Sequence, residues 1–533
     1  MSTARVHARN LLANWTGQAA SIVVMFFLSP FVVHTLGKSQ YGLWSLLVVL
    51  TGYMGLFDLG VRASTGRYVI LYYGRGDHAR LDETLRTGLG LFSLGGVLIL
   101  LAAVVIGLAF PMVFPSAPAE YQHLTMLLLP VLAVNVWLSI LGALFSSVLA
   151  AHDRFDLMQA TGIVSLAIRA AGTVFVLKSG YGICGLTAMA LTDGLISAFG
   201  NAWLARRIYP QLRVWPLMLS RERLREMFGY GVPAFLSSIA GRVIAQSATI
   251  LVGALIAVSA VTDYSIGAML PFYAAPFLYQ IGCTLFPAVQ RAAARNDLDS
   301  MRWLFVRQVQ MALLFAVLVY IGFIAFGEAF LRIWMGPGFA GAFTVLVILS
   351  ITELVASTLI YAGMQLLNAT GRLWFQVAGL ACEGVISVSL GVFFVLVLDW
   401  GVAGVAAGAL TGRLFDIAIT WYACRVAAIR WQVLKGVLLR GVLAAVSFAA
   451  WCFVVRTMIV AEAWSSFFLQ VGLAVAGYVP LALALLVPQA DRARLYRLLH
   501  TLAWQRAGRS AEADPVQPSD LGIAGSGLGG EEK

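Results

Sequence analysis

Leu36-Gly37-Lys38-Ser39-Gln40-Tyr41-Gly42-Leu43-Trp44 is the stretch that decides the fold, and it continues to Phe57-Asp58-Leu59-Gly60 and Arg67. It joins two long apolar segments through a turn of about four residues, and the second segment carries charges within apolar sequence. A charge in hydrocarbon costs roughly 2.5 to 3.5 kcal/mol on insertion scales, so an intramembrane ionisable group is expected to be functional or tightly paired. Asp58 and Arg62 are four residues apart and would share one helix face, which leaves open whether they act on a ligand or neutralise each other.

The composition is typical of a helical protein that crosses a membrane many times. Of 533 residues, 60% are hydrophobic and 11% are charged, and the mean hydropathy is +0.86. Apolar runs long enough to cross a bilayer recur along the chain, so we predict an all-α polytopic membrane protein with about 14 transmembrane helices. The five cysteines lie in apolar segments without Cys-x-x-Cys spacing, which predicts neither a disulfide framework nor a metal site.

The apolar runs give the approximate positions of the spans. We predict them at 13–35, 41–69, 86–110, 122–150, 156–177, 183–205, 228–257, 262–289, 304–326, 341–369, 374–398, 402–424, 437–458 and 466–488.

Loop charge tests this count independently. The basic residues fall almost wholly in alternate loops, and the opposite loops hold only Lys38, Lys178, Arg332 and Arg456. Because short basic loops stay on the cytoplasmic side, both termini are predicted to be cytoplasmic. The net charge of +11 then follows from membrane orientation and does not indicate nucleic-acid binding.

An internal repeat divides the chain. The segment 181–192 (YGICGLTAMALT) recurs as 400–411 (WGVAGVAAGALT), about 219 residues later, and Leu149–Arg154 answers Leu367–Arg372. Both loop arginines are predicted on the same side of the membrane, so each repeat holds an even number of spans. Six plus six fits, with two further helices appended. Parallel repeats of this kind are typical of transporters, whose substrate site lies between the halves.

This repeat sets the predicted domain organisation. We expect a six-helix N-terminal lobe, a basic cytoplasmic linker, a six-helix C-terminal lobe, two additional helices and a largely disordered cytoplasmic tail, at 1–205, 206–226, 227–425, 436–488 and 489–533 respectively. Gly404, Gly408 and Gly412 stand four apart and predict close helix packing inside the second repeat.

A set of short motifs resembles a known family. Leu36-Gly37, Tyr41-Gly42-Leu43-Trp44, Phe57-Asp58-Leu59-Gly60, Arg67, Gly76-Asp77 and Leu285-Phe286-Pro287-Ala288 with Arg291 are similar to the bacterial polysaccharide biosynthesis proteins, the Wzx-type flippases. These belong to the multidrug, oligosaccharidyl-lipid and polysaccharide exporter superfamily. The sequence departs from the family pattern near Ala248-Thr249, where an Asp-Arg pair is common, so the resemblance places no coupling site there.

The resemblance implies both a fold and an activity. The fold would be two six-helix lobes forming a V in the bacterial inner membrane. The activity would be the transfer of an undecaprenyl-pyrophosphate-linked glycan from the cytoplasmic to the outer leaflet. The partners would then be the lipid-linked oligosaccharide, the bilayer, and the polymerase and export machinery of a polysaccharide pathway.

Depth along the helices selects candidate substrate-binding residues. Helix rise places Arg169, Arg242 and Arg413 near mid-membrane and Arg62 nearer the cytoplasmic interface. Guanidinium groups can replace the water of a pyrophosphate by bidentate, charge-assisted hydrogen bonds. The alternative is that the arginines only pair with buried acids and connect helices. Scattered polar residues would contact the glycan, among them Asn135, Gln159, Asn201 and Gln365.

Buried acids favour a second hypothesis, that a proton or sodium gradient drives the cycle. The candidates are Asp58, Asp193, Glu353 and Glu383, and salt-bridging is the alternative role for each. No cofactor and no catalytic residue is predicted. The stretch Gly37-Lys38-Ser39 resembles the end of a phosphate loop, but Val32 stands where its first glycine would be required.

Two rival functions stay open at this stage. A multidrug or cation exporter would use the same fold, although the surplus of arginine at mid-membrane disfavours cationic cargo. A membrane-embedded glycosyltransferase or ligase would need a sizeable domain or loop outside the membrane. The longest predicted outer loops, 111–121 and 327–340, are too short for that.

Overall fold

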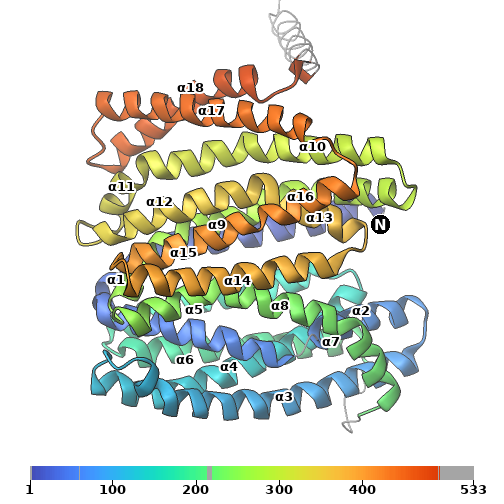
Figure 1. Cartoon of the computed structure of the whole chain (residues 1–533). Coiled ribbons are helices and arrows are strands. Elements are labelled where there is room, and N and C mark those ends of the chain that lie inside the picture. Colours follow the sequence, from blue (N-terminus) through green and yellow to red (C-terminus); the bar gives the residue numbers. More distant parts are fainter. Residues whose placement is uncertain (1–2, 59–60, 213–218, 490, 493–533) are drawn as a thin grey trace, which may run out of the picture.

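The computed structural model describes residues 3–58, 61–212, 219–489 and 491–492, and those residues form helices joined by short turns without any strand. Helices that cross a bilayer satisfy their own backbone hydrogen bonds, which is why apolar sequence of this kind folds as helix. Figure 1 shows the long helices lying roughly side by side, with the chain running back and forth between the two ends of the bundle. Twelve of the helices in these ranges are long and apolar enough to cross a membrane.

The first half of the chain is an N-terminal bundle. It contains α1 (Thr3–Met54), the 3₁₀ turn η1 (Gly55–Asp58), α2 (Val61–Gly74), α3 (His78–Val113), α4 (Ala119–Ala151), α5 (Phe155–Lys178), α6 (Gly182–Leu195), the π-helical turn η2 (Ile196–Gly200) and α7 (Asn201–Ile208). Together η2 and α7 continue α6, so that one predicted span is built from three helical pieces.

The second half repeats this plan and adds two helices. It contains α8 (Arg221–Leu255), α9 (Ala260–Ala294), α10 (Leu298–Ala316), η3 (Val317–Ile321), α11 (Gly322–Met335), α12 (Ala340–Val355), η4 (Ala356–Ile360), α13 (Tyr361–Ala369), α14 (Leu373–Leu396), α15 (Gly401–Phe415), α16 (Ile417–Val426), α17 (Trp431–Met458) and α18 (Trp464–Leu485). The last two pack on each other and on α10 and α11, at the upper edge of Figure 1.

Two predicted spans need correction in detail. The runs 13–35 and 41–69 are not separate helices, because α1 continues through a kink at Gly37, whose backbone is left-handed in φ (φ 74°, ψ 169°). The second run is also interrupted, since η1 ends at Asp58 and α2 begins at Val61. Run 228–257 falls in α8, whose apolar part Ile239–Leu255 is shorter than a full span. Counting α1 as two passes and adding α8 brings the twelve spans to the predicted fourteen.

Backbone geometry supports the internal repeat. Residues with positive φ occupy matching places in the two halves, about 219 residues apart: Gly76 and Asn296, Asp153 and Gly371, Gly182 and Gly401. The helix that follows the first matching turn is capped in the same way in both halves. The side chains of Asp77 and Asp297 accept backbone N–H groups of Arg80 and Ser300, at 3.1 and 3.0 Å.

The basic turns all lie at one end of the bundle. We call this end, with the turns around 75–77, 152–154, 295–297, 370–372 and 427–430, the basic end; it lies to the right in Figure 1. The end that carries Lys38, Lys178 and Arg332 is the opposite end. Helices α1, α8 and α9 connect the two halves, since α1 packs on α8 and α9, and α8 packs on α2 and α3 as well as on α14 and α15.

Close packing of the glycines in α15 is confirmed. A Cβ atom on Gly408 would lie 2.6 Å from the Gly391 Cα atom and 2.6 Å from the Ser387 carbonyl oxygen, both on α14. These contacts are with backbone atoms, so α14 and α15 touch along their main chains as small residues allow.

We therefore expect Gly408→Ala to lower the melting temperature of the protein in detergent. Overpacking of this kind costs about 1 to 3 kcal/mol, since neither backbone can move away cheaply. The matched control is Gly472→Ala on α18, where a Cβ atom would have nothing within 4 Å. The control should leave the melting temperature unchanged or raise it slightly, through the better helix propensity of alanine. Equal melting temperatures for the two variants would contradict this packing.

Candidate functional site

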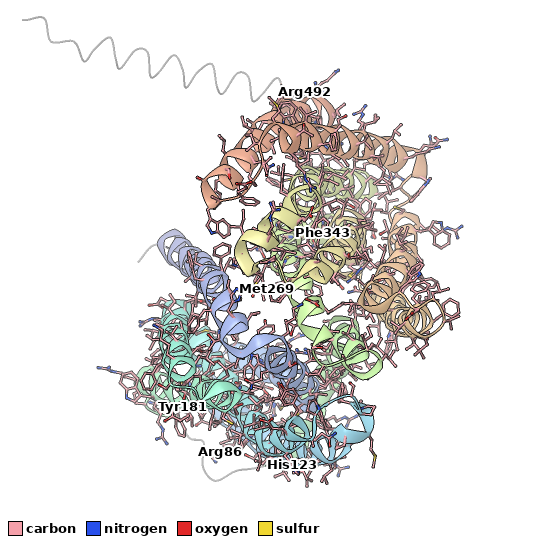
Figure 2. The ribbon with its side chains drawn as sticks, turned by 90° about the vertical axis from the view of Figure 1, so that its left-hand side faces the viewer. Arg86, His123, Tyr181, Met269, Phe343 and Arg492 are labelled. Atoms are coloured by element: carbon pink, nitrogen blue, oxygen red, sulfur yellow. The ribbon has the colours of Figure 1, made fainter. Side chains whose placement is uncertain are left out.

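A cavity of about 380 Å³ lies against α1, with walls from α4, α5, α6 and α9. Arg169 of α5 and Asp193 of α6 face it from the N-terminal bundle, and Met269 and Tyr273 of α9 face it from the other half. Met269 is labelled in Figure 2, where α9 stands beside α1 between the two halves. The cavity therefore lies where substrate sites of repeat-built transporters are expected.

A second, more polar pocket of about 280 Å³ lies on the basic-end side of the first one. Its walls include Arg62 of α2, Ser165 of α5 and Asn201 of α7. Asp193 lines both pockets, so the two spaces meet at this carboxylate. Arg62, Asp193 and Arg169 thus form a line of charged groups inside the N-terminal bundle, which we call the polar track.

The centre of the polar track is a loose ion pair. Arg169 Nη1 lies 3.9 Å from Asp193 Oδ2, and the two side chains keep 35% and 36% of their surface exposed. Ser165 Oγ donates a hydrogen bond to Asp193 Oδ1. A guanidinium held at this distance and still exposed to a cavity retains donors for another anion.

Arg242 lies elsewhere, at the contact between α8 and α1. With the Gln246 amide nitrogen donating to the Val49 carbonyl oxygen at 2.7 Å, the amide oxygen accepts from Arg242 Nη1 at 3.2 Å. The side chain of Arg242 is exposed and lines neither of the two pockets. It therefore lies at the junction of the two halves and outside the polar track.

Arg413 is enclosed by acids in the second half. Its guanidinium lies 3.2 Å from Glu383 and 3.9 Å from both Glu353 and Asp416, and only 12% of the side chain is exposed. Arg413, Glu353, Glu383 and Asp416 are named the Arg413 cluster below. Of the two roles left open for Arg413, the structure shows the pairing with buried acids, and it brings two of the predicted coupling acids to this arginine.

Asp58 and Arg62 do not share one helix. Asp58 is the last residue of η1, Arg62 is the second residue of α2, and residues 59–60 lie outside the described ranges. The single helix face expected for this pair is therefore wrong. Arg62 belongs to the polar pocket.

Several lining residues escaped the sequence analysis. Asn135 and Asn201 were expected to be polar contacts, and they line the two pockets; Ser165, Thr173 and Tyr273 were not singled out. Hydroxyl residues are common in membrane helices because they bond their own backbone, so their presence carries no signal for a cavity. No group of three His, Cys, Asp or Glu side chains within the described ranges is placed to hold a metal ion.

Comparison with known proteins agrees with this geometry. The family described as polysaccharide biosynthesis protein matches residues 97–344. A protein of Shigella flexneri named "Putative O-antigen transporter" is 23% identical over 361 residues, which cover 64% of this chain and 80% of that protein.

Solved structures share the fold. A structure of the lipid II flippase MurJ in an inward closed conformation superposes with a TM-score of 0.70 at 12% identity, over 89% of this chain and 97% of MurJ. An inward-facing multidrug resistance transporter of the MATE family superposes with a TM-score of 0.64 at 14% identity, over 78% of this chain and 96% of that one.

The fold and the pockets define a multi-pass membrane transporter of the multidrug, oligosaccharidyl-lipid and polysaccharide exporter superfamily. Within it, the chain belongs to the polysaccharide biosynthesis proteins of the Wzx type, as the resemblance of its motifs implied. The proteins it matches are named as transporters and flippases, which confirms the prediction that the chain is not an enzyme.

The two arginine environments predict different mutational costs. Arg413→Gln leaves three buried carboxylates without their cation, so we expect a loss of about 3 to 5 kcal/mol of stability. Arg169→Gln removes a half-exposed ion pair and should cost less than about 1 kcal/mol. Thermal unfolding of the purified variants in detergent measures the difference. Similar melting temperatures would contradict the distinction between the Arg413 cluster and the polar track.

Proposed function

We propose that the protein flips a polyprenyl-pyrophosphate-linked oligosaccharide from the cytoplasmic to the outer leaflet of the bacterial inner membrane. The product would serve the assembly of exopolysaccharide, capsule or O-antigen by a polymerase and export machinery. The observation that carries this proposal is the polar track, because it offers two arginines in series to a phosphorylated headgroup inside an otherwise apolar bundle.

Charge chemistry explains why arginine suits this cargo. A pyrophosphate that leaves water loses strong hydration, and planar guanidinium groups replace that hydration with paired hydrogen bonds. Arg62 lies toward the basic end, predicted to be cytoplasmic, and Arg169 lies deeper. A headgroup admitted from the cytoplasmic side would meet Arg62 first and Arg169 second. The names of the Shigella relative and of MurJ support a lipid-linked cargo of this kind.

Contacts between the halves support alternating access. At the opposite end, Lys38 Nζ of α1 donates to Asp263 Oδ1 of α9 at 2.9 Å, and Thr262 Oγ1 donates to the Lys38 carbonyl oxygen at 2.6 Å. Further along α1, Trp334 Nε1 donates to the Phe26 carbonyl oxygen at 2.8 Å. These contacts join α1 of the first half to the second half and form an outer closure.

A second set of contacts lies at the basic end. Arg223 of α8 is 3% exposed and lies 3.4 Å from Glu83 of α3, while its guanidinium also contacts the Tyr72 hydroxyl of α2. Glu226, one turn further along α8, accepts from the Tyr72 hydroxyl at 2.8 Å. We propose that this inner closure and the outer closure open in turn, so that the polar track is never open to both sides at once.

The MATE neighbour keeps one rival function in view, the export of small cationic compounds. Asp193 is the acid that such cargo would use within the polar track. Two arginines in the same track repel a cation, which is why we favour an anionic headgroup. Deletion of the gene separates the two functions: a flippase defect accumulates lipid-linked repeat units on the inner leaflet, whereas a drug exporter defect raises sensitivity to cationic dyes.

Arg169→Ala and Arg62→Ala should each reduce glycan export about tenfold to a hundredfold. A hydrogen bond to a charged group contributes about 1.5 to 3 kcal/mol, and that difference corresponds to such factors. The matched control is Arg456→Ala on α17, whose side chain pairs with Glu328 at the exposed surface and should leave export unchanged. Export is measured as surface polysaccharide per cell at equal protein level. Normal export in both cavity variants would refute the proposed role of the track.

Lys38→Asp should open the outer closure, because the new carboxylate would repel Asp263. A cysteine placed at Thr173, which lines the larger cavity, should then react faster with a membrane-impermeant thiol reagent added from outside. A variant free of the native cysteines provides the background for this labelling. The charge-swapped double variant Lys38→Asp with Asp263→Lys should restore slow labelling. Equally slow labelling in all three proteins would show that this ion pair does not hold the closure.

A further inference from the structure

The Arg413 cluster lies in the second half, away from both pockets of the polar track. Glu353 comes from α12, Glu383 from α14 and Arg413 from α15, and Asp416 follows α15 directly. The three carboxylate side chains are 5%, 1% and 0% exposed, in the order Glu353, Glu383 and Asp416. The cluster is therefore sealed from water in this conformation.

The charges of the cluster do not balance. Arg413 is the basic side chain that forms ion pairs with these carboxylates among the described residues, and it faces three of them. One guanidinium against three ionised carboxylates would bury a net charge of about minus two, and each uncompensated buried ion costs several kcal/mol. Proteins resolve such an excess by keeping a carboxyl group protonated.

The geometry indicates which carboxyl groups share the proton. The side chains of Glu383 and Asp416 lie within hydrogen-bonding reach of each other. Neither carboxylate oxygen of Asp416 has a hydrogen-bond donor in the structure, although the side chain is fully buried. Glu353, in contrast, accepts a hydrogen bond from the Tyr361 hydroxyl at 2.9 Å. A proton on Glu383 would give Asp416 the donor that it lacks.

The groups around the cluster supply no competing charge. Tyr320 of η3 and Tyr361 of α13 face Glu353, and Tyr279 of α9 packs edge-on against Tyr361 with ring centroids 5.4 Å apart. Cys283 lies one turn beyond Tyr279 on α9, and the α8 face that packs on α14 next to Glu383 is apolar, through Val243 and Ile244. Arg242 precedes that face and bonds toward α1.

We propose that Glu383 and Asp416 bind one shared proton, and that this proton is the coupling ion of the transport cycle. Release breaks the O–H bond of the shared carboxyl group, passes the proton to water and leaves both groups ionised beside Arg413. Rebinding reverses the step. A metal cation fits less well, since the cluster does not present ligands placed to hold one within the described part of the chain. The coupling role rests on the proposed function, whereas the proton site does not.

The cluster is connected to the rest of the protein through α8. Gly384, the residue after Glu383, lies against Val243 of α8, where a Cβ atom would come within 3.2 Å of Val243 Cγ1. Val243 follows Arg242, whose partner Gln246 bonds to α1. At its start, α8 carries Arg223 of the inner closure. Ionisation at Glu383 adds a buried charge beside this helix, so any movement that admits water to the cluster also moves the element that closes the basic end.

Infrared spectroscopy of the purified protein in lipid nanodiscs tests the site without substrate. Wild-type protein near neutral pH should show the carbonyl stretch of a protonated, buried carboxylic acid. Glu383→Gln and Asp416→Asn should each remove this band completely, because one proton is shared by both groups. The matched control is Glu328→Gln, an exposed acid paired with Arg456, and it should leave the band in place. Absence of the band in wild type, or loss of only half of it in each variant, would overturn the shared proton.

Proteoliposomes carrying the lipid-linked glycan test the coupling role. One coupled proton supplies about a tenfold change in the transbilayer substrate ratio per pH unit of gradient. We expect this dependence in wild type and in Glu328→Gln, and its complete loss in Glu383→Gln. Flipping that follows a sodium gradient and ignores the pH gradient would overturn the coupling role. The infrared band is read without substrate, so a failure of the proposed cargo is distinguished from a failure of the proton site.

Discussion

The cost of holding a charge in hydrocarbon is the constraint on which this structure depends. A bundle this apolar accepts an ionised side chain only if a partner or water compensates it. The protein uses both solutions. Arg413 is sealed among three carboxylates, whereas Arg169 and Arg62 line internal pockets where their guanidinium groups stay accessible. The same residue type therefore serves stability in one half and is available to a ligand in the other.

The connection between the halves follows from two long helices. The kink of α1 at Gly37 brings the following residues against the second half, where Gly42 approaches the Val258 carbonyl oxygen so closely that a Cβ atom would lie 2.0 Å from it. At the other end, α8 carries Arg223 into a pocket formed by α2 and α3. Each closure thus joins a helix of one half to the body of the other, which lets a change in one half alter the accessibility of the track in its partner.

The sequence predicted the architecture well, because hydrophobic length and loop charge are local properties. The positions of most spans, the repeat of about 219 residues and the close packing of α15 on α14 followed from apolar runs and glycine spacing. The interruption by η1 was missed, since the residues on both sides of it read as one apolar run. Depth along a helix could not distinguish Arg413 from Arg169, because both lie at similar depth and differ only in what surrounds them.

The sequence alone determined that the chain is a helical membrane protein built from two repeats with two further helices, since those features depend on composition and on periodicity. Only the tertiary structure decided which arginines reach a cavity, which acids gather around Arg413, and that Asp193 stands where two pockets meet. Side-chain surroundings arise from helices distant in the chain, and the rotation of each helix about its axis is set by packing against its neighbours. No pattern within a single helix records that rotation.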